Sequence, residues 1–420
     1  MRIRLAVLLM AFVTTAASAQ DDRPPVPDDP VERRADSVAV AEEAREVLDT
    51  MKIDGEPKYD REETLAIGAA PWQLSYFPYI TGGSNDGPML AFRTRWWKPA
   101  EYEDRVTTMA ALTIDAGLGT QGSRFLTAEA EIPRLAFGWR AKAMVGAIRE
   151  ARYGFYGLGN DTELDEDLVT DEQPYFYKVT RNRYVGTAEV TRVIRGPFMV
   201  ALLGGVERAR FSTLPGASVF GTVFGEETAE TDIFSRLALL YDTRDNEYNP
   251  HNGLLLEAGV QAGSGGGDYS RVYFTGRGYR TLTPRLLLAA RVLGSRMGGD
   301  PALNSMLFVP LWEDPLSMYG GSDTNRGIDR GRFAGPHALF TNLELRYDLR
   351  SFGDFGALSL LGFLDAGRVF EDEFRITTDG LHVGAGGGVA VRLLRSTIFT
   401  FTLARGSDGA EFNIDSGWMF

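Results

Sequence analysis

The strongest constraint on this chain is a two-residue alternation that repeats from Pro71 to Phe420. Segments of about ten residues carry apolar side chains at every second position and are separated by Gly, Asp, Asn or Pro. In one such segment Leu254, Leu256 and Val260 share a face, and polar residues share the other. Each segment therefore presents one face to lipid or a core and the opposite face to water, as a β-strand does.

Counting these segments predicts about 16 strands, an even number that returns both ends of a barrel to the same side. The predicted strands are 72–80, 88–97, 106–118, 123–132, 138–152, 174–193, 198–212, 231–242, 251–263, 268–281, 284–295, 338–349, 357–370, 381–393, 396–405 and 411–420. Short turns such as 195–197 alternate with the long loops 153–173, 213–230 and 296–337. This alternation is typical of periplasmic turns and extracellular loops, so the predicted fold is all-β: a transmembrane antiparallel outer-membrane β-barrel over 71–420.

The N-terminal residues indicate export. Two arginines precede the apolar run from Leu5 to Val13, and small residues lead up to Ala19. This order is typical of a secretory signal peptide, predicted as residues 1–19, because so short an apolar run cannot span a bilayer. Residues 20–70 are polar and charged and are predicted to form a periplasmic spacer, with apolar spacing compatible with one short helix over 31–52.

Composition excludes several classes of site. The chain has no cysteine, which excludes disulfides, thiolate metal sites and a cysteine nucleophile. Its formal net charge of -13 argues against a nucleic-acid partner, because phosphate recognition needs a basic face. The acidic stretch 160–172 fits a solvated loop, with a divalent-cation site as the alternative. We predict no cofactor and no metal.

Catalytic motifs are missing as well. The three histidines, His251, His337 and His382, stand in no recognisable nucleophile arrangement, and no Gly-x-Ser-x-Gly elbow occurs. The glycine-rich stretch 263–267 lacks the Lys-Ser/Thr that would follow it in a phosphate-binding loop. We therefore expect that the protein is not an enzyme.

The C-terminal segment alternates up to an aromatic last residue. Apolar side chains at every second position end with Trp418 and Phe420. We expect both rings to lie in the periplasmic aromatic girdle of a final strand. The segment resembles the terminal signal by which outer-membrane barrels are delivered for assembly.

The long loop 296–337 contains the most specific motif, GGSDTNRGIDRGRFAG, from Gly320 to Gly335. It resembles the sixth extracellular loop of the BamA/TamA superfamily, also called the bacterial surface antigen family. The family's signature is a glycine pair followed by an apolar-Arg-Gly-aromatic tetrad and a later basic-aromatic pair. The matching residues are Gly320, Gly321, Arg326, Gly327, Arg332 and Phe333.

Two positions depart from this signature: Asn325 replaces the apolar residue and Ile328 replaces the aromatic one. Arg330 with the following glycine offers a second register, and the distance to the later basic-aromatic pair favours Arg326. Further resemblances to the family are found in 156–160, 241–253, 343–345 and 363–369, so the likeness covers about 150–420.

The resemblance implies that Arg326 contacts Glu344 and Asp365 inside the barrel. A loop folded into a barrel needs strong anchors, and a planar guanidinium can bridge two carboxylates with charge-assisted hydrogen bonds. The contact would lock the loop to the wall. The alternative is that these charges only line a wet lumen.

A second predicted feature is a weak seam between the first and last strands. Pro78 lacks an N–H, and Gly417 has no side chain to pack, so each should weaken strand pairing. In the superfamily, lateral opening at this seam is thought to pass substrates into the membrane. Proline near a strand end is also simply tolerated, so the gate remains one of two interpretations.

The predicted function follows from the resemblance. The protein would help to assemble, insert or translocate proteins or lipids at the bacterial outer membrane. A spacer of about 50 residues is too short for a POTRA module, so a short member without POTRA domains is expected. Expected partners are outer-membrane lipids and lipopolysaccharide, unfolded outer-membrane or secreted proteins, and the barrel-assembly machinery for its own insertion. The alternative is a passive pore or surface antigen without insertase activity.

Overall fold

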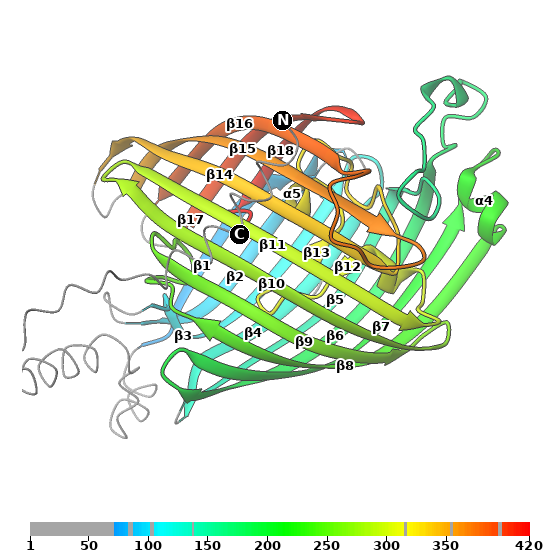
Figure 1. Cartoon of the computed structure of the whole chain (residues 1–420). Coiled ribbons are helices and arrows are strands. Elements are labelled where there is room, and N and C mark those ends of the chain that lie inside the picture. The colour runs from blue at the N-terminus through cyan, green and yellow to red at the C-terminus, as the bar shows by residue number, and fades with distance from the viewer. Residues whose placement is uncertain are drawn as a thin grey trace, which may run out of the picture. The chain divides into compact units, whose positions relative to one another are not determined.

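The computed structural model describes residues 71–82, 87–100, 105–136, 138–314, 317–352, 356–393 and 397–420. The predicted signal peptide, spacer and helix over 31–52 lie outside these residues. Within them the chain forms one 16-stranded antiparallel sheet, nearly closed into a barrel, in which strands pair in chain order (Figure 1). No helix in this part of the chain is both long enough and apolar enough to cross a membrane.

The sheet begins with β1 (Gln73–Thr81), β2 (Met89–Pro99), β3 (Thr108–Gly119), β4 (Arg124–Ala136), β5 (Trp139–Gly154), β6 (Lys178–Arg195), β7 (Phe198–Thr213) and β8 (Glu227–Asp242). It continues with β9 (Gly253–Ser264), β10 (Asp268–Thr283), β11 (Leu286–Gly299), β14 (His337–Ser351), β15 (Gly356–Phe370), β16 (His382–Leu393), β17 (Thr397–Gly406) and β18 (Gly409–Ser416). The helix α4 (Val219–Phe224) lies in the loop between β7 and β8.

The all-β barrel and its strand number are therefore confirmed, and most predicted boundaries agree with the structure to within a few residues. The last strand is the exception. It was predicted over 411–420, whereas β18 ends at Ser416. Gly417 has a φ of +102°, a conformation that glycine adopts readily, and it turns the final residues out of the sheet.

The two faces of the sheet differ in chemistry as the alternation predicts. On β6, the side chains of Arg181, Arg183 and Glu189 point into the barrel and are buried, whereas Tyr184 and Val190 point outward and are exposed. An exposed apolar outer surface around a charged interior is the pattern of a barrel that contacts lipid.

The barrel interior is filled largely by the long loop between β11 and β14, which we call the inner loop (residues 300–336). It contains the 3₁₀ turn Asn304–Leu307, the short strands β12 (Phe308–Val309) and β13 (Ser317–Met318), and the single-turn helix α5 (Gly321–Thr324). Figure 1 shows these elements within the ring of strands. Leu311, Tyr319 and Ile328 of the loop form a buried cluster with Leu293 and Phe340 of the wall, so the loop packs as part of the core.

The two ends of the sheet meet without a hydrogen-bonded ladder. In the described residues the strand order runs from β1 to β18 and no backbone pairing joins these two strands. Instead, Phe77 of β1 packs against Phe399 of β17, with ring centroids 5.6 Å apart. By the alternation, Phe77 lies on the inner side of β1 and Phe399 on the outer side of β17, so β1 overlaps the other end from outside.

A charge placed on the outer surface tests this architecture. Val206 of β7 faces outward near the middle of the apolar band, so Val206→Arg should destabilise the barrel in lipid vesicles by about 2–4 kcal/mol. Ile194→Arg, at the periplasmic end, should cost about 1 kcal/mol or less. Urea-induced unfolding measures both, and equal effects would contradict the proposed depth of the band.

Candidate functional site

The centre of the site is a buried guanidinium that ties the inner loop to the wall. Arg326 follows α5, and its Nε and Nη2 donate to the two carboxylate oxygens of Asp365 on β15 at 2.8 and 3.0 Å. Its Nη1 donates to Glu344 on β14. The backbone N–H of Arg326 also donates to Asp365, at 3.0 Å. The structure thus brings together the three charged residues that the sequence singled out.

The contact between Arg326 and the two carboxylates is shielded from water. The side chains of Arg326, Glu344 and Asp365 are each 3 % exposed or less. Burial alone would lower the pKa of Arg326, but Asp365 and Glu344 outweigh it and raise that pKa. The guanidinium also lies over the Phe363 ring, 3.6 Å from its centroid, which adds a cation–π contact. A wet lumen merely lined by charges does not fit this geometry.

Close backbone approach explains the glycine after the arginine. Gly327 has a φ of +86°, and a Cβ there would lie 2.9 Å from the backbone of Arg405 at the end of β17. On the opposing strand β16, a Cβ at Gly384 would lie only 1.7 Å from the Arg326 carbonyl oxygen. The loop therefore rests its backbone directly on β16 and β17, which only glycine allows.

The remaining residues of the motif anchor the same loop at its extracellular end. Arg332 donates to the Oγ1 and the carbonyl oxygen of Thr162, both at 2.5 Å, and pairs with Asp408 at 3.2 Å. Phe333 stacks on His382, with ring centroids 4.1 Å apart. Arg330, the alternative arginine, is half-exposed and pairs with Asp323 at 3.2 Å. The geometry therefore selects the Arg326 register.

The glycine pair at the start of the motif has a structural role. Gly320 and Gly321 both have positive φ, of 82° and 63°. They begin α5, and the Gly320 N–H donates to Thr324 Oγ1 at 2.7 Å. This tight turn directs the next residues toward the wall, where Asn325 donates to the His382 carbonyl at 2.9 Å. The polar Asn325, which departs from the family signature, is therefore accommodated by a hydrogen bond.

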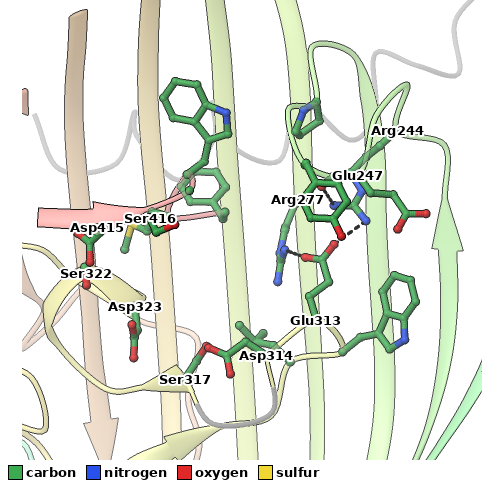
Figure 2. Close-up of a pocket in the computed structure, with 18 of the residues that line it drawn as sticks. Arg244, Glu247, Arg277, Glu313, Asp314, Ser317, Ser322, Asp323, Asp415 and Ser416 are labelled. Carbon is green, nitrogen blue, oxygen red and sulfur yellow. Dashed lines mark hydrogen bonds and ion pairs between the residues drawn. The ribbon is translucent and has the colours of Figure 1, made fainter. Parts of the chain in front are cut away.

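A second anchor holds the inner loop to β10 and to the turn between β8 and β9. Glu313 accepts from Arg244 at 2.8 Å and also from Arg277 (Figure 2). Burial raises the pKa of Glu313, but the two arginines outweigh burial and lower that pKa to about 2. Beside it, Trp312 Nε1 donates to Thr191 on β6 at 3.1 Å. The loop is thus fastened on two sides of the barrel.

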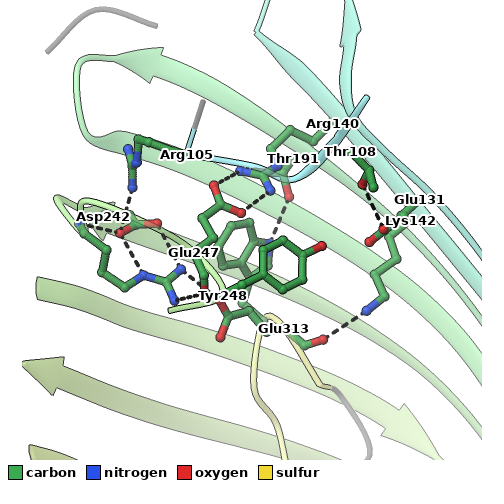
Figure 3. A network of polar contacts seen from close by, with 12 residues as sticks. Arg105, Thr108, Glu131, Arg140, Lys142, Thr191, Asp242, Glu247, Tyr248 and Glu313 are labelled. Atoms are coloured by element: carbon green, nitrogen blue, oxygen red, sulfur yellow. Dashed lines mark hydrogen bonds and ion pairs between the residues drawn. The ribbon is translucent and has the colours of Figure 1, made fainter. Parts of the chain in front are cut away.

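The turn between β8 and β9 (residues 243–252) joins this second anchor to the periplasmic end of the barrel. Its Glu247 accepts from Arg140 of β5 at 2.8 and 2.7 Å, and its backbone N–H donates to the Arg105 carbonyl at 3.1 Å (Figure 3). Burial raises the pKa of Glu247, but Arg140 outweighs it and lowers the pKa. Because Arg105 precedes β3, the turn crosses from one wall toward another and narrows the bore.

Between the two anchors lies a cavity of about 480 Å³. Charged residues from β4, β5 and β6 line it, together with the inner loop and the last residues of the chain. In the parts of the chain that the structure describes, no group of three or more His, Asp or Glu side chains is placed to hold a metal ion. The cavity is a polar part of the lumen.

Comparison with known proteins identifies the family. Residues 159–398 match the model of the Omp85 superfamily domain, which is more than half of the chain. The chain belongs to the Omp85 superfamily. This agrees with the resemblance to BamA and TamA found in the loop motif. A search of curated proteins returned no match.

Solved structures support the same fold at low sequence identity. The chain is similar to BamA from Haemophilus ducreyi lacking POTRA domains 1–3, with 14 % identity, a TM-score of 0.51, and coverage of 82 % of this chain and 69 % of that one. It is also similar to CdiB from Escherichia coli, with 13 % identity, a TM-score of 0.55 and coverage of 82 %. The chain spans only 62 % of the CdiB chain's length. These likenesses establish the barrel fold.

The last residues of this Omp85 barrel lie inside the lumen, contrary to prediction. The Phe420 carbonyl accepts from Arg346 Nη2 at 2.9 Å, and Trp418 Nε1 donates to Asn249 at 2.8 Å. The expected place in the lipid-facing aromatic girdle was therefore wrong, because the turn at Gly417 redirects both rings inward. Their role as an assembly signal remains a prediction.

Of the two residues predicted to weaken the seam, one lies within a strand and the other does not. Pro78 lies within β1, opposite Phe92 of β2. Gly417 lies beyond the last strand and ends β18, rather than weakening a pairing within it. In the described residues no ladder joins β1 to β18, and β18 ends just before the chain turns inward at Gly417.

Sequence reasoning missed three residues that complete the site. Asn342 of β14 donates to Asp365 at 2.8 Å and accepts from Arg291 of β11 at 2.9 Å. Arg346 donates to Glu344 at 2.7 Å and so links the Arg326 contact to the chain terminus. Asn342 and Arg346 lie on the same strand as Glu344, and Arg291 lies on the neighbouring strand β11. Their inward-facing positions near Glu344 were the only signal in the sequence.

The Arg326 anchor can be tested by its removal. Arg326→Ala should destabilise the barrel by about 3–5 kcal/mol, because it leaves the buried carboxylate of Asp365 without its ion-pair partner and Glu344 with Arg346 alone. Heat-modifiable migration on gels and urea unfolding measure the loss. Arg330→Ala, which removes a half-exposed pair, should cost about 1 kcal/mol or less.

A compensated variant separates charge from packing. Arg326→Ala combined with Asp365→Asn should recover part of the lost stability, because Asp365 is then neutral and Glu344 keeps its ion pair with Arg346. If Arg326→Ala and Arg330→Ala behave alike, the anchor has no special role.

The second anchor predicts a closed lumen that opens when Glu313 loses its charge. In planar bilayers at neutral pH, Glu313→Gln should raise the frequency of open-channel events by about tenfold, the effect of losing a charged hydrogen bond. Asp314→Asn, which removes a charge from the same cavity without breaking that contact, should stay near wild type.

The pH dependence has a defined sign. The folded-state pKa of Glu313 lies below its usual value of 4.5, so its attraction is fully present above about pH 4.5 and is lost as pH falls toward about 2. Wild-type conductance should rise over that interval, and Glu313→Gln should abolish this part of the rise. A steady, large conductance of the wild type at pH 7 would contradict a closed lumen.

Proposed function

We propose that this protein acts at the bacterial outer membrane, where it inserts or translocates proteins or lipids through the seam between β1 and β18. The observation that carries the proposal is the unpaired end of the sheet. Every other neighbouring pair of strands in the described barrel is joined by a hydrogen-bonded ladder, whereas these two ends overlap through aromatic packing. The unpaired backbone of an edge strand is a template for another strand.

Membership of the Omp85 superfamily and the barrel fold shared with BamA and CdiB support this location and this general role. The exposed apolar outer surface adds a physical reason, because it needs lipid around it. Unfolded outer-membrane or secreted proteins are the proposed substrates, and the barrel-assembly machinery is proposed to insert the protein itself. The proposal includes no enzymatic step.

The filled lumen favours this function over the passive pore. The inner loop is held at two walls, and the turn 243–252 narrows the periplasmic end. A passive pore needs a continuous water path, whereas a lateral seam works beside a filled bore. The connected contacts from Arg326 through Glu344 and Arg346 to Phe420 also link the inner loop to the residues that follow β18.

Cross-linking the seam tests the proposal. The chain has no cysteine, so Phe77→Cys with Phe399→Cys can be joined specifically by a short bifunctional thiol reagent. In cells depleted of the native protein, the cross-linked variant should fail to restore the normal inventory of outer-membrane proteins and lipids, and a reagent that can be cleaved should allow recovery.

The control joins two strands that already pair. Gly204→Cys with Ser235→Cys links β7 to β8 at directly opposite positions and should leave function unchanged. Full function of the cross-linked seam variant would overturn the proposal. A depletion strain whose outer-membrane protein and lipid inventory is normal would do so independently.

A further inference from the structure

A row of arginines runs around the outside of the barrel at its extracellular end. Arg124 of β4, Arg149 of β5 and Arg210 of β7 lie on one level, because Arg124 is opposite Arg149, Arg149 is opposite Asn182 of β6, and Asn182 is opposite Arg210. We call these three arginines the outer row. All lie on outward-facing positions, alternating with buried inward-facing neighbours such as Glu150, Arg183 and Ala209.

The level of the row coincides with the edge of the apolar band. Between Asn182 and the outward-facing Arg192 on the same strand, the outward positions of β4 to β8 carry no charge except Arg208, one step below the row. Ten residues of strand at about 3.3 Å each, tilted by about 40°, span a height of about 25 Å. That height equals the apolar band of an outer-membrane barrel. The outer row therefore lies at the extracellular interface of the membrane.

The side chains below the row suit acyl chains. Tyr184 lies next to Arg208 one step toward the membrane, and Val145, Val206 and Ile233 follow on the next level. Tyr184 is 63 % exposed and Ile233 is 64 % exposed, so both rely on lipid for cover. A tyrosine at the interface above aliphatic residues is the usual arrangement for a headgroup boundary.

The row is predominantly positive. Arg208 lies beside the row, and within the described residues Glu227 pairs with Arg210 at 2.6 Å. Both partners of that pair are about half exposed, so the pair contributes little and yields readily to a stronger anion. Arg149 donates to Asn182 at 3.1 Å, which holds its guanidinium along the surface.

The spacing matches an anion with two phosphates. Opposite residues on neighbouring strands lie about 5 Å apart, so Arg124 and Arg149 can both bind the same phosphate. Arg210 lies two strands from Arg149, about 10 Å away, and is placed for a second phosphate. Guanidinium groups bind phosphate in a bidentate manner that ammonium groups cannot reproduce.

We propose that Arg124, Arg149 and Arg210 form a binding site for the phosphorylated sugar headgroup of lipopolysaccharide, with its acyl chains lying along Tyr184 and the aliphatic side chains beneath. The site rests on the outer-membrane location given under the proposed function. It is separate from the seam, since it occupies β4 to β7 on another part of the wall. It would hold this side of the barrel against the outer leaflet while the seam moves.

The test measures lipid binding rather than insertion. The full chain in phosphatidylcholine nanodiscs is titrated with bisphosphorylated lipid A, and native mass spectrometry counts the bound lipid. The wild-type protein should bind one molecule of bisphosphorylated lipid A at this site. Monophosphoryl lipid A should bind to it more weakly. Arg124→Gln with Arg149→Gln and Arg210→Gln should weaken binding by about tenfold to a hundredfold, because each interfacial arginine contributes to attraction for anionic lipid.

The matched control replaces three arginines at the periplasmic end of the barrel. Arg195→Gln with Arg280→Gln and Arg285→Gln removes three exposed arginines at the periplasmic end and should leave lipid A binding unchanged. Heat-modifiable migration shows whether each triple variant is folded, and the comparison of the two lipid A forms on wild type needs no variant.

Three outcomes would overturn the proposal: equal binding of the two lipid A forms, unchanged binding by the outer-row variant, or equal competition by phosphatidylglycerol. The last would assign the row to anionic lipids in general. None of these outcomes depends on the seam, so a failure here is distinguishable from a failure of the seam cross-linking experiment.

Discussion

The arrangement inside this barrel depends on one buried charge. Arg326 enters the wall from a loop and neutralises Glu344 and Asp365, which stand on adjacent strands. Without the guanidinium, Asp365 would lose its ion-pair partner in a site shielded from water, and Glu344 would keep only Arg346. A buried ion pair adds less to net stability than to position, because desolvation offsets the attraction, yet the loss of one partner is costly. The contact therefore determines where the inner loop lies.

Once the loop is placed, its other contacts follow around the barrel. Glu313 reaches Arg244 in the turn between β8 and β9 and Arg277 on β10, and Arg332 reaches the extracellular loop at Thr162. The loop thus braces the wall from within, while its centre fills the bore. Among the strands that the structure describes, the one junction without a ladder is that of β1 and β18. Because the rest of the wall is held by ladders and by the inner loop, we expect the wall to open first between β1 and β18.

Much of this could be predicted from sequence, because strand alternation is a local property. The 16 strands and the bounds of the long loop were reached in that way, whereas the inward fold of that loop and the choice of Arg326 over Arg330 needed a family resemblance. The position of Trp418 was wrong because apolar alternation continues through the last residues, and a single glycine gave no sign that the chain would turn inward. Asn342 and Arg346 were missed because a polar inward position looks the same whether or not it contacts the loop.

The sequence by itself determined the strand pattern, the two-faced wall and the residue types able to anchor a loop. Only the tertiary structure decided which charges meet. The chain has 44 Lys and Arg residues and 57 Asp and Glu residues, and nothing in their order pairs Glu313 with Arg244 or Arg140 with Glu247. Those pairs lie far apart in sequence and come together because ladder register and barrel curvature bring distant strands to face a common lumen.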